Sequence, residues 1–213
     1  SVGMSSDLSA RCRSAGVPMV LFNRSQDDPN MSAVTSDNYA GGRKAAKFLL
    51  AAGHQKIGHI AGWHGASTQR DREAGFISVL AEAGVVLHSR AEGDFTLEKA
   101  ADAARKMFAH DAPEAVFVAN DHMALAVLDT LRFELGLKVP EDVSVVGYDD
   151  VPAAGWPAYA LTTVRQPANR MVANTVEILL DQIENNTGET RRIAIDGPLI
   201  LRGSAKIPEG WTT

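Results

Sequence analysis

The chain has 213 residues, of which 45% are hydrophobic and only 6% aromatic, and its formal net charge is -5. This content is enough for one large core or two small ones, which excludes a disordered protein and favours helices packed on a sheet over a β-sandwich. Because Asp and Glu outnumber Lys and Arg, the chain itself is not expected to bind DNA.

Four short runs rich in β-branched residues are predicted strands, and each is bounded by Gly, Pro, Asn or Asp. They cover Val17–Phe22, Lys56–Ala61, Ala115–Ala119 and Val143–Tyr148.

Amphipathic helices are predicted between these strands. The first begins after Asp37 as N-cap and ends at Gly53, and the second begins at Ser67 or Thr68 and ends at Gly84. Later helices are predicted at Leu97–His110 and from Asp121 to Gly136, with Asp121 interpreted as a helix cap. The last helix covers Pro167–Glu184 and carries one apolar stripe, formed by Val172, Val176, Leu179 and Ile183. A strand-like segment, Arg192–Leu201, follows it.

The alternation of strand and helix predicts an α/β fold with doubly wound parallel sheets, since parallel strands need crossover helices. Residues 37–164 hold a nearly complete set of such units. Residues 1–36 contain only one short helical piece and one strand, so we expect a truncated N-terminal lobe.

Ligands of open α/β sheets bind at the carboxyl ends of the strands, and the residues at these positions are mostly polar. Carboxylates and amides bind vicinal hydroxyls, Arg adds paired donors, and an aromatic ring covers the C–H face of a sugar, so the pattern favours a polyol ligand. The strand-end residues are Asn23, Arg24, Gly62, Trp63, Asp94, Phe95, Asn120, Asp121, Asp149 and Asp150.

Purely structural roles remain open for several of these residues. Asp150 fits a cap as well as a ligand contact, Arg72 in the first turn of a helix fits a solvated surface charge, and Phe95 fits a core position. No phosphate-loop, dinucleotide-binding, nucleophile-elbow or metal-binding motif is present, so we expect no enzyme activity, cofactor or metal. Cys12, the single cysteine, lacks an adjacent base for nucleophilic chemistry.

Consecutive segments resemble signatures of the LacI family of transcription regulators. They are GVPMVLFNR, SDNYAGGRKAAKFLLAAGHQKIGHIAG, STQRDREAGF, EGDFT, VFVANDHMALAVL, VPEDVSVVGYDD, LTTVRQP and GPLILRGS. The resemblance covers residues from about 16 to 205 in order. It implies two periplasmic-binding-protein-like lobes joined by three crossings, with a helix-turn-helix headpiece that is absent from this chain.

By this resemblance the crossings fall near Thr35–Asp37, Val164–Gln166 and Ile193–Asp196. The N-terminal lobe is then expected to comprise residues 1–36 and 166–193, the C-terminal lobe residues 37–164 and 194–206, and a tail residues 207–213.

The resemblance also implies a small-molecule effector, a carbohydrate by class, and assigns its contacts to Asn23, Thr68, Arg72, Phe95, Asn120, Asp149 and Gln166. Two positions depart from the family: Trp63, a possible cleft residue, replaces a frequent Pro, and Asn23 replaces a frequent Asp. The class of effector is therefore implied, but not its identity. We expect Asp149→Ala to lower effector affinity by roughly ten- to more than a hundredfold while folding barely suffers.

The leading hypothesis is thus the effector-binding core of a cytoplasmic, homodimeric repressor, with allosteric control of operator binding through the missing headpiece and no membrane partner. By the resemblance, residues near Ala153–Ala160 and the helix Asp121–Leu135 would contribute to the dimer. A periplasmic sugar-binding protein of a transporter shares the fold and remains the alternative. No export signal and no apolar run of about 18 residues is present, which favours the cytoplasm.

Overall fold

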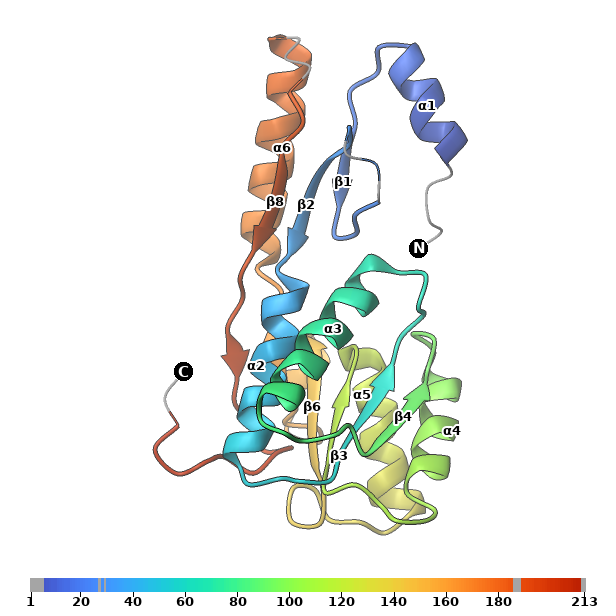
Figure 1. Cartoon of the computed structure of the whole chain (residues 1–213), viewed down its shortest axis with the longest axis vertical. Coiled ribbons are helices and arrows are strands. Elements are labelled where there is room, and N and C mark those ends of the chain that lie inside the picture. Colours follow the sequence, from blue (N-terminus) through green and yellow to red (C-terminus); the bar gives the residue numbers. More distant parts are fainter. Residues whose placement is uncertain (1–5, 27, 29, 186–188, 212–213) are drawn as a thin grey trace.

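Two β-sheets, one above the other in Figure 1, organise the computed structural model, which describes residues 6–26, 28, 30–185 and 189–211. The larger sheet has the strand order β4-β3-β5-β6-β7-β9 and is parallel except for β9, which pairs antiparallel with β7. Its strands are β3 (Ile57–Ala61), β4 (Ser89–Glu92), β5 (Ala115–Val118), β6 (Ser144–Asp149), β7 (Thr162–Arg165) and β9 (Leu199–Ile200).

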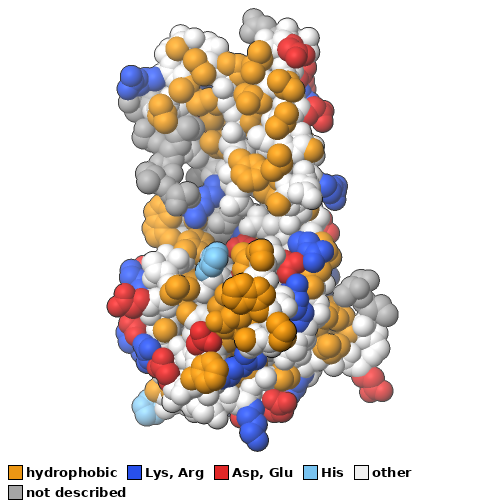
Figure 2. Space-filling view, turned by 180° about the vertical axis from the view of Figure 1, so that it is seen from behind, with side chains coloured by type: hydrophobic (Ala, Val, Ile, Leu, Met, Phe, Trp, Pro, Cys, Tyr) orange, Lys and Arg blue, Asp and Glu red, His pale blue; other side chains and the backbone are white. Residues whose placement is uncertain are grey.

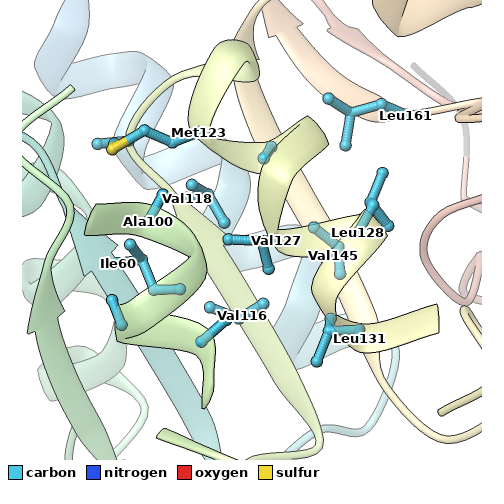
Figure 3. Close-up of a cluster of buried hydrophobic side chains, with 14 of the residues drawn as sticks. Ile60, Ala100, Val116, Val118, Met123, Val127, Leu128, Leu131, Val145 and Leu161 are labelled. Carbon is cyan, nitrogen blue, oxygen red and sulfur yellow. The ribbon is translucent and has the colours of Figure 1, made fainter. Parts of the chain in front are cut away.

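Helices cover both faces of this larger sheet, as expected for a doubly wound fold. On one face lie α2 (Asn38–Ala51) and α3 (Ser67–Glu82), whose apolar side chains pack with Phe117 and Tyr148. On the other face lie α4 (Leu97–Met107) and α5 (Asp121–Asp129), which bury a second cluster that includes Ile60, Val116 and Leu128 (Figure 3). A π-helical turn (Thr130–Glu134) follows α5, and a 3-10 turn (Pro152–Gly155) precedes β7.

Helices α2 and α3 cross at very short distance. A Cβ atom at Gly42 would lie 2.0 Å from the backbone oxygen of Arg72, and one at Gly75 would lie 2.0 Å from that of Tyr39. Only glycine leaves room for this backbone contact, which explains both glycines. The contact also fixes the start of α3, where two candidate site residues lie.

The smaller sheet has the order β1-β2-β8 and is parallel throughout. It consists of β1 (Val20–Phe22), β2 (Ser32–Ser36) and β8 (Arg192–Ile195), with α1 (Ser6–Ser14) and α6 (Ala168–Glu184) beside it (Figure 1). Helix α6 packs on this sheet through Met171 and Ile178, which join Val34 and Ile195 in a small core.

The chain passes between the two sheets three times: after β2, after β7 and after β8. These passages fall at the expected crossings. We refer to the part around the smaller sheet as the upper lobe and to the part around the larger sheet as the lower lobe; the exact division into folding units stays a proposal.

Most predicted helix starts and ends agree with the structure. Asp37 caps α2 by accepting a hydrogen bond from the Ala40 backbone N–H, and Gly53 and Gly84 follow their helices with positive φ. None of the described helices is long and apolar enough to cross a lipid bilayer.

Two predictions about the upper lobe were wrong. Residues 1–36 hold two strands and not one, because Ser32–Ser36 pairs between β1 and β8 although its sequence shows no bulky alternation. The apolar stripe on α6 does not face the core: Val172 is 51% exposed and Val176 and Ile183 are exposed too. The three-stranded sheet contacts only the Met171 side of the helix, so the predicted stripe faces away. Figure 2 shows hydrophobic side chains gathered on the surface of this lobe.

Candidate ligand-binding cavity

A cavity of about 160 Å³ lies where the two lobes meet. It is lined by strand-end residues and by the first turns of α3. All seven effector contacts implied by the family resemblance surround it, together with one further side chain: Asn23, Arg24, Thr68, Arg72, Phe95, Asn120, Asp149 and Gln166. Residues on six different segments, up to 143 positions apart in the sequence, thus converge on one small, mostly polar space.

Arg72 is the most buried charge of the cavity, with 2% of its surface exposed. Its guanidinium donates to the Asn38 side-chain oxygen (2.9 Å), to the Ala119 backbone oxygen (2.5 Å) and to Asp149 Oδ1 (3.1 Å). It also lies 3.6 Å from the ring centroid of Tyr148, a cation–π contact. The interpretation of Arg72 as a solvated surface charge is therefore wrong: the side chain is held rigidly with one edge at the cavity.

Asp149 ends strand β6 and faces the guanidinium of Arg72. Its Oδ1 atom accepts hydrogen bonds from Arg72 Nη2 and from Gln166 Nε2, the latter at 2.5 Å. Both of these donors use the same oxygen, which leaves Oδ2 for a ligand hydroxyl. The pair is partly buried, so its electrostatic interaction is weakly screened by salt.

Asn120 lies between strand β5 and helix α5 and is the N-cap of that helix. Its Oδ1 accepts a 3.0 Å hydrogen bond from the Met123 backbone N–H, so its NH2 group remains for the cavity. The interpretation of Asp121 as the cap was wrong. Asp121 is the first helical residue, and its fully buried carboxylate points away from the helix end to Thr163 and Val151.

Phe95, Arg24 and Asn23 close the other side of the cavity. The ring of Phe95 lies beneath the Arg24 guanidinium, 5.6 Å from ring centroid to Cζ, and Phe95 itself has φ of 60°. Asn23 has φ of 69°, a conformation that Asn tolerates better than most residues. Its Oδ1 is buried without a hydrogen-bond partner among the described residues, which is costly unless a ligand supplies a donor.

Thr68 is buried in the first turn of α3, and the neighbouring Ser67 hydroxyl accepts a hydrogen bond from the Ser25 backbone N–H, which ties α3 to the upper lobe. Trp63, expected as a possible cleft residue, does not line the cavity: it is 47% exposed and its ring packs against Gly65. Arg24 is the residue that the family resemblance omitted, although its position after β1 placed it among the strand-end residues.

The cavity offers hydrogen-bond donors, acceptors and one aromatic face, but its described residues include no nucleophile paired with a base. Cys12 lies in α1, away from the residues that line it. Among the described residues, no group of three or more His, Cys, Asp or Glu side chains could hold a metal ion. The arrangement is suited to binding a small polyhydroxylated molecule.

Comparison with known proteins gives one consistent result. A family model described as the periplasmic binding protein-like domain matches residues 46–205. The chain is similar to the HTH-type transcriptional repressor PurR of Photobacterium profundum, with 34% identity over 197 residues that cover 91% of this chain and 59% of that protein. It is 35% identical to PurR of Aliivibrio salmonicida, covering 88% and 57%. The chain thus spans less than two thirds of the curated relatives it matches.

Solved structures agree with the sequence relatives. The transcriptional regulator CelR in complex with cellobiose superposes with a TM-score of 0.87 at 35% identity, covering 95% of this chain and 63% of that one. A LacI transcriptional regulator from a Rhodococcus species has a TM-score of 0.87 at 31% identity, covering 97% and 76%. A LacI family regulator from Enterococcus faecium with bound ribose has a TM-score of 0.86 at 25% identity, covering 96% and 76%.

Proposed function

Because the chain belongs to the periplasmic binding protein-like family, as the effector-binding core of a LacI-type regulator and not as a transporter protein, we propose that its cavity binds a sugar that controls transcription. The observation that carries the proposal is the ring of polar groups around Arg72 and Asp149 at the junction of the lobes.

A sugar ring fits the chemistry of this cavity. Asp149 Oδ2 and the unpartnered Asn23 Oδ1 would accept hydrogen bonds from hydroxyl groups, while Arg72 and the Asn120 NH2 group would donate. The ring of Phe95 would cover the apolar C–H face. Since the Asn23 Oδ1 atom is buried without a partner among the described residues, a bound hydroxyl would complete its hydrogen bonding.

The sugar would also link the two lobes. Asn23 and Arg24 belong to the upper lobe, whereas Phe95, Asn120 and Asp149 belong to the lower lobe. A ligand that contacts both favours the closed arrangement, and by linkage a closed arrangement binds it more tightly. In the whole regulator this closure would change the affinity of a DNA-binding headpiece, in the cytoplasm and without catalysis.

We further propose that the chain forms a homodimer through the lower lobe. Phe133 is 80% exposed and Trp156 is also exposed, and both lie within the segments that the family resemblance assigns to the dimer. Arg132 holds the two segments together by donating to the Ala158 backbone oxygen (2.6 Å). Exposed aromatic side chains of this size are typical of the centres of protein interfaces.

A thermal-shift screen of sugars tests the proposed ligand class. The panel includes cellobiose and ribose, which the solved relatives contain. A sugar at about 100 times its dissociation constant stabilises by roughly 2.7 kcal/mol, which raises the melting temperature by roughly 5–10 °C. The matched control is Asp111→Asn, an exposed carboxylate paired with Lys56 outside the cavity, which should respond like the wild type. A panel of mono- and disaccharides that shifts neither protein would reject a sugar as the ligand.

A further inference from the structure

Asp121 follows the cavity residue Asn120 in the sequence but does not itself line the cavity. Its side chain is fully buried at the start of α5. One carboxylate oxygen accepts a hydrogen bond from the Thr163 hydroxyl at 2.6 Å, and the other accepts from the Val151 backbone N–H at 2.9 Å. Val151 lies two residues beyond Asp149, the last residue of β6. Asp121 therefore holds the chain just beyond Asp149.

The segment that Asp121 holds is strained. Asp149 has φ of 124° and Asp150 has φ of 59°, two consecutive residues with side chains in the region that favours glycine. Such conformations persist only where the surrounding structure imposes them, and they gather at ligand-binding sites. The strain turns the chain so that the Asp149 side chain meets Arg72 and Gln166 at the cavity.

Strand β6 makes room for the buried carboxylate. A Cβ atom at Gly147 would lie only 2.3 Å from Asp121 Oδ1, so this position admits no side chain. The glycine in the VVGYDD segment is thus explained by Asp121, and the two residues form one structural unit.

We propose that Asp121 is a positioning residue for Asp149: by binding the Val151 N–H it holds the strained Asp149–Asp150 turn in the orientation that presents the Asp149 carboxylate to the ligand. The inference concerns the cavity itself and, for its effect on sugar affinity, rests on the proposed function.

The hydrogen bond from the Val151 N–H to Asp121 should depend on pH, because its acceptor is a titratable carboxylate. Burial, helped by the nearby Asp149 carboxylate, raises the pKa of its carboxyl to about 6, against the opposing hydrogen bonds from the Thr163 hydroxyl and the Val151 and Asp150 backbone N–H groups. As the pH falls through about 6, the carboxylate gains a proton and becomes a weaker acceptor for the Val151 N–H. The turn should then loosen, and sugar affinity should fall.

Other charged groups face this turn from the elements around it. Asp150 is nearly buried and pairs with Arg165 and Arg202, each at 2.6 Å. The groups around Asp121 are Asp149 and Asp150 at the end of β6, Arg72 on α3, Arg165 on β7, Arg202 near the C-terminus, and the exposed His122 beside it on α5.

Hydrogen exchange of the Val151 amide, measured without any sugar, tests directly whether Asp121 binds this N–H. After correction for intrinsic exchange rates, the protection of the Val151 amide in the wild type should fall severalfold from pH 7.5 to pH 5. Asp121→Asn keeps an acceptor but no charge, so its protection should lie below that of the wild type at pH 7.5 and be independent of pH. The Val151 amide of Asp121→Ala should exchange at least about tenfold faster than that of the wild type. If Asp121→Ala fails to fold, the result for Asp121→Asn decides the test.

Two controls isolate the carboxylate. Asp129→Asn alters the other end of α5, where the carboxylate bonds the Tyr159 hydroxyl, and should leave Val151 unchanged. His122→Gln removes the exposed histidine beside Asp121 and should keep the wild-type pH profile. Unchanged Val151 protection in Asp121→Asn, at both pH values, would overturn the proposal.

Titration with cellobiose and with ribose then connects the turn to binding. For the sugar that binds, the wild-type dissociation constant should rise at least about threefold from pH 7.5 to pH 5, and that of Asp121→Asn should not change with pH. Equal pH profiles for the two proteins would refute a role in affinity. If neither sugar binds the wild type, these two sugars are rejected as ligands in the proposed function, whereas the Val151 measurement still decides whether Asp121 holds the turn.

Discussion

Asp149→Ala should affect both sugar binding and folding, because the Asp149 carboxylate lies at the cavity and also pairs with the buried Arg72. In Asp149→Ala the guanidinium loses one partner but keeps its hydrogen bonds to Asn38 and the Ala119 backbone, and Gln166 loses its acceptor. We therefore expect the free energy of unfolding to fall by about 1–3 kcal/mol, below the cost of a fully buried broken ion pair. From these contacts we expect a larger cost to folding than the sequence alone suggested.

Asp149→Ala should also lower sugar affinity, by more than its loss of folding stability can account for. Loss of one or two charge-assisted hydrogen bonds, each about 1.5–3 kcal/mol, lowers affinity roughly tenfold to more than a hundredfold. Urea denaturation gives the first quantity, and calorimetric titration with the sugar that shifts the melting temperature most gives the second.

A double variant, Arg72→Met with Asp149→Leu, helps to distinguish the loss of sugar affinity from the loss of folding stability. Replacing both members removes the unpaired charge, but it also leaves the Asn38 side-chain oxygen and the Ala119 backbone oxygen without their donor, so its stability should stay near that of Asp149→Ala. Its sugar affinity should stay lost. A stable double variant that still binds within about twofold of the wild type would refute the assignment of Arg72 and Asp149 to the ligand site.

Four further predictions follow from the same contacts. Phe95→Ala should weaken binding of a pyranose more than that of an open-chain polyol, because the flat apolar face is lost; competition titration with the two ligands measures the ratio. Asn23→Gly keeps the positive φ and removes an unpartnered buried oxygen, so unfolding should change little while affinity falls, as paired denaturation and calorimetry would reveal. Because the folded-state pKa of Asp121 is raised to about 6, its contribution to the free energy of unfolding should decrease as the pH rises from about 4 to 6, and Asp121→Asn should flatten that slope in urea titrations across this range. Phe133→Ser combined with Trp156→Ser should shift sedimentation at micromolar concentration from dimer to monomer; an unchanged dimer would place the interface elsewhere.

The sequence predicted the lower lobe well because its signals are local. Asp37 and Gly53 bound α2 through capping chemistry, and strand-end positions follow from parallel topology, so Asn120 and Asp149 could be placed at one edge of a sheet. The convergence of all seven expected contacts on one cavity depends on the family resemblance more than on periodicity, since only long-range packing brings Asn23 and Gln166 together.

What the sequence did not predict depends on tertiary contacts. The exposed side of α6 carries Val172 and Val176 because the small sheet reaches only the Met171 side, which periodicity alone does not reveal. The exchange of roles between Asn120 and Asp121 arises because the Thr163 hydroxyl and the Val151 N–H each donate to one oxygen of the Asp121 carboxylate, which leaves the Asn120 side chain to cap α5. Neither partner is near in sequence.

The crystal structure of this chain with the sugar that gives the largest thermal shift tests the central claim most directly. We predict that the sugar lies between the lobes with a ring face on Phe95 and hydroxyls within hydrogen-bond distance of Asp149, Arg72 and Asn23. A sugar bound instead in the 200 Å³ cavity of the upper lobe, beside Pro18 and Gln182, or anywhere else on the surface, would contradict the claim.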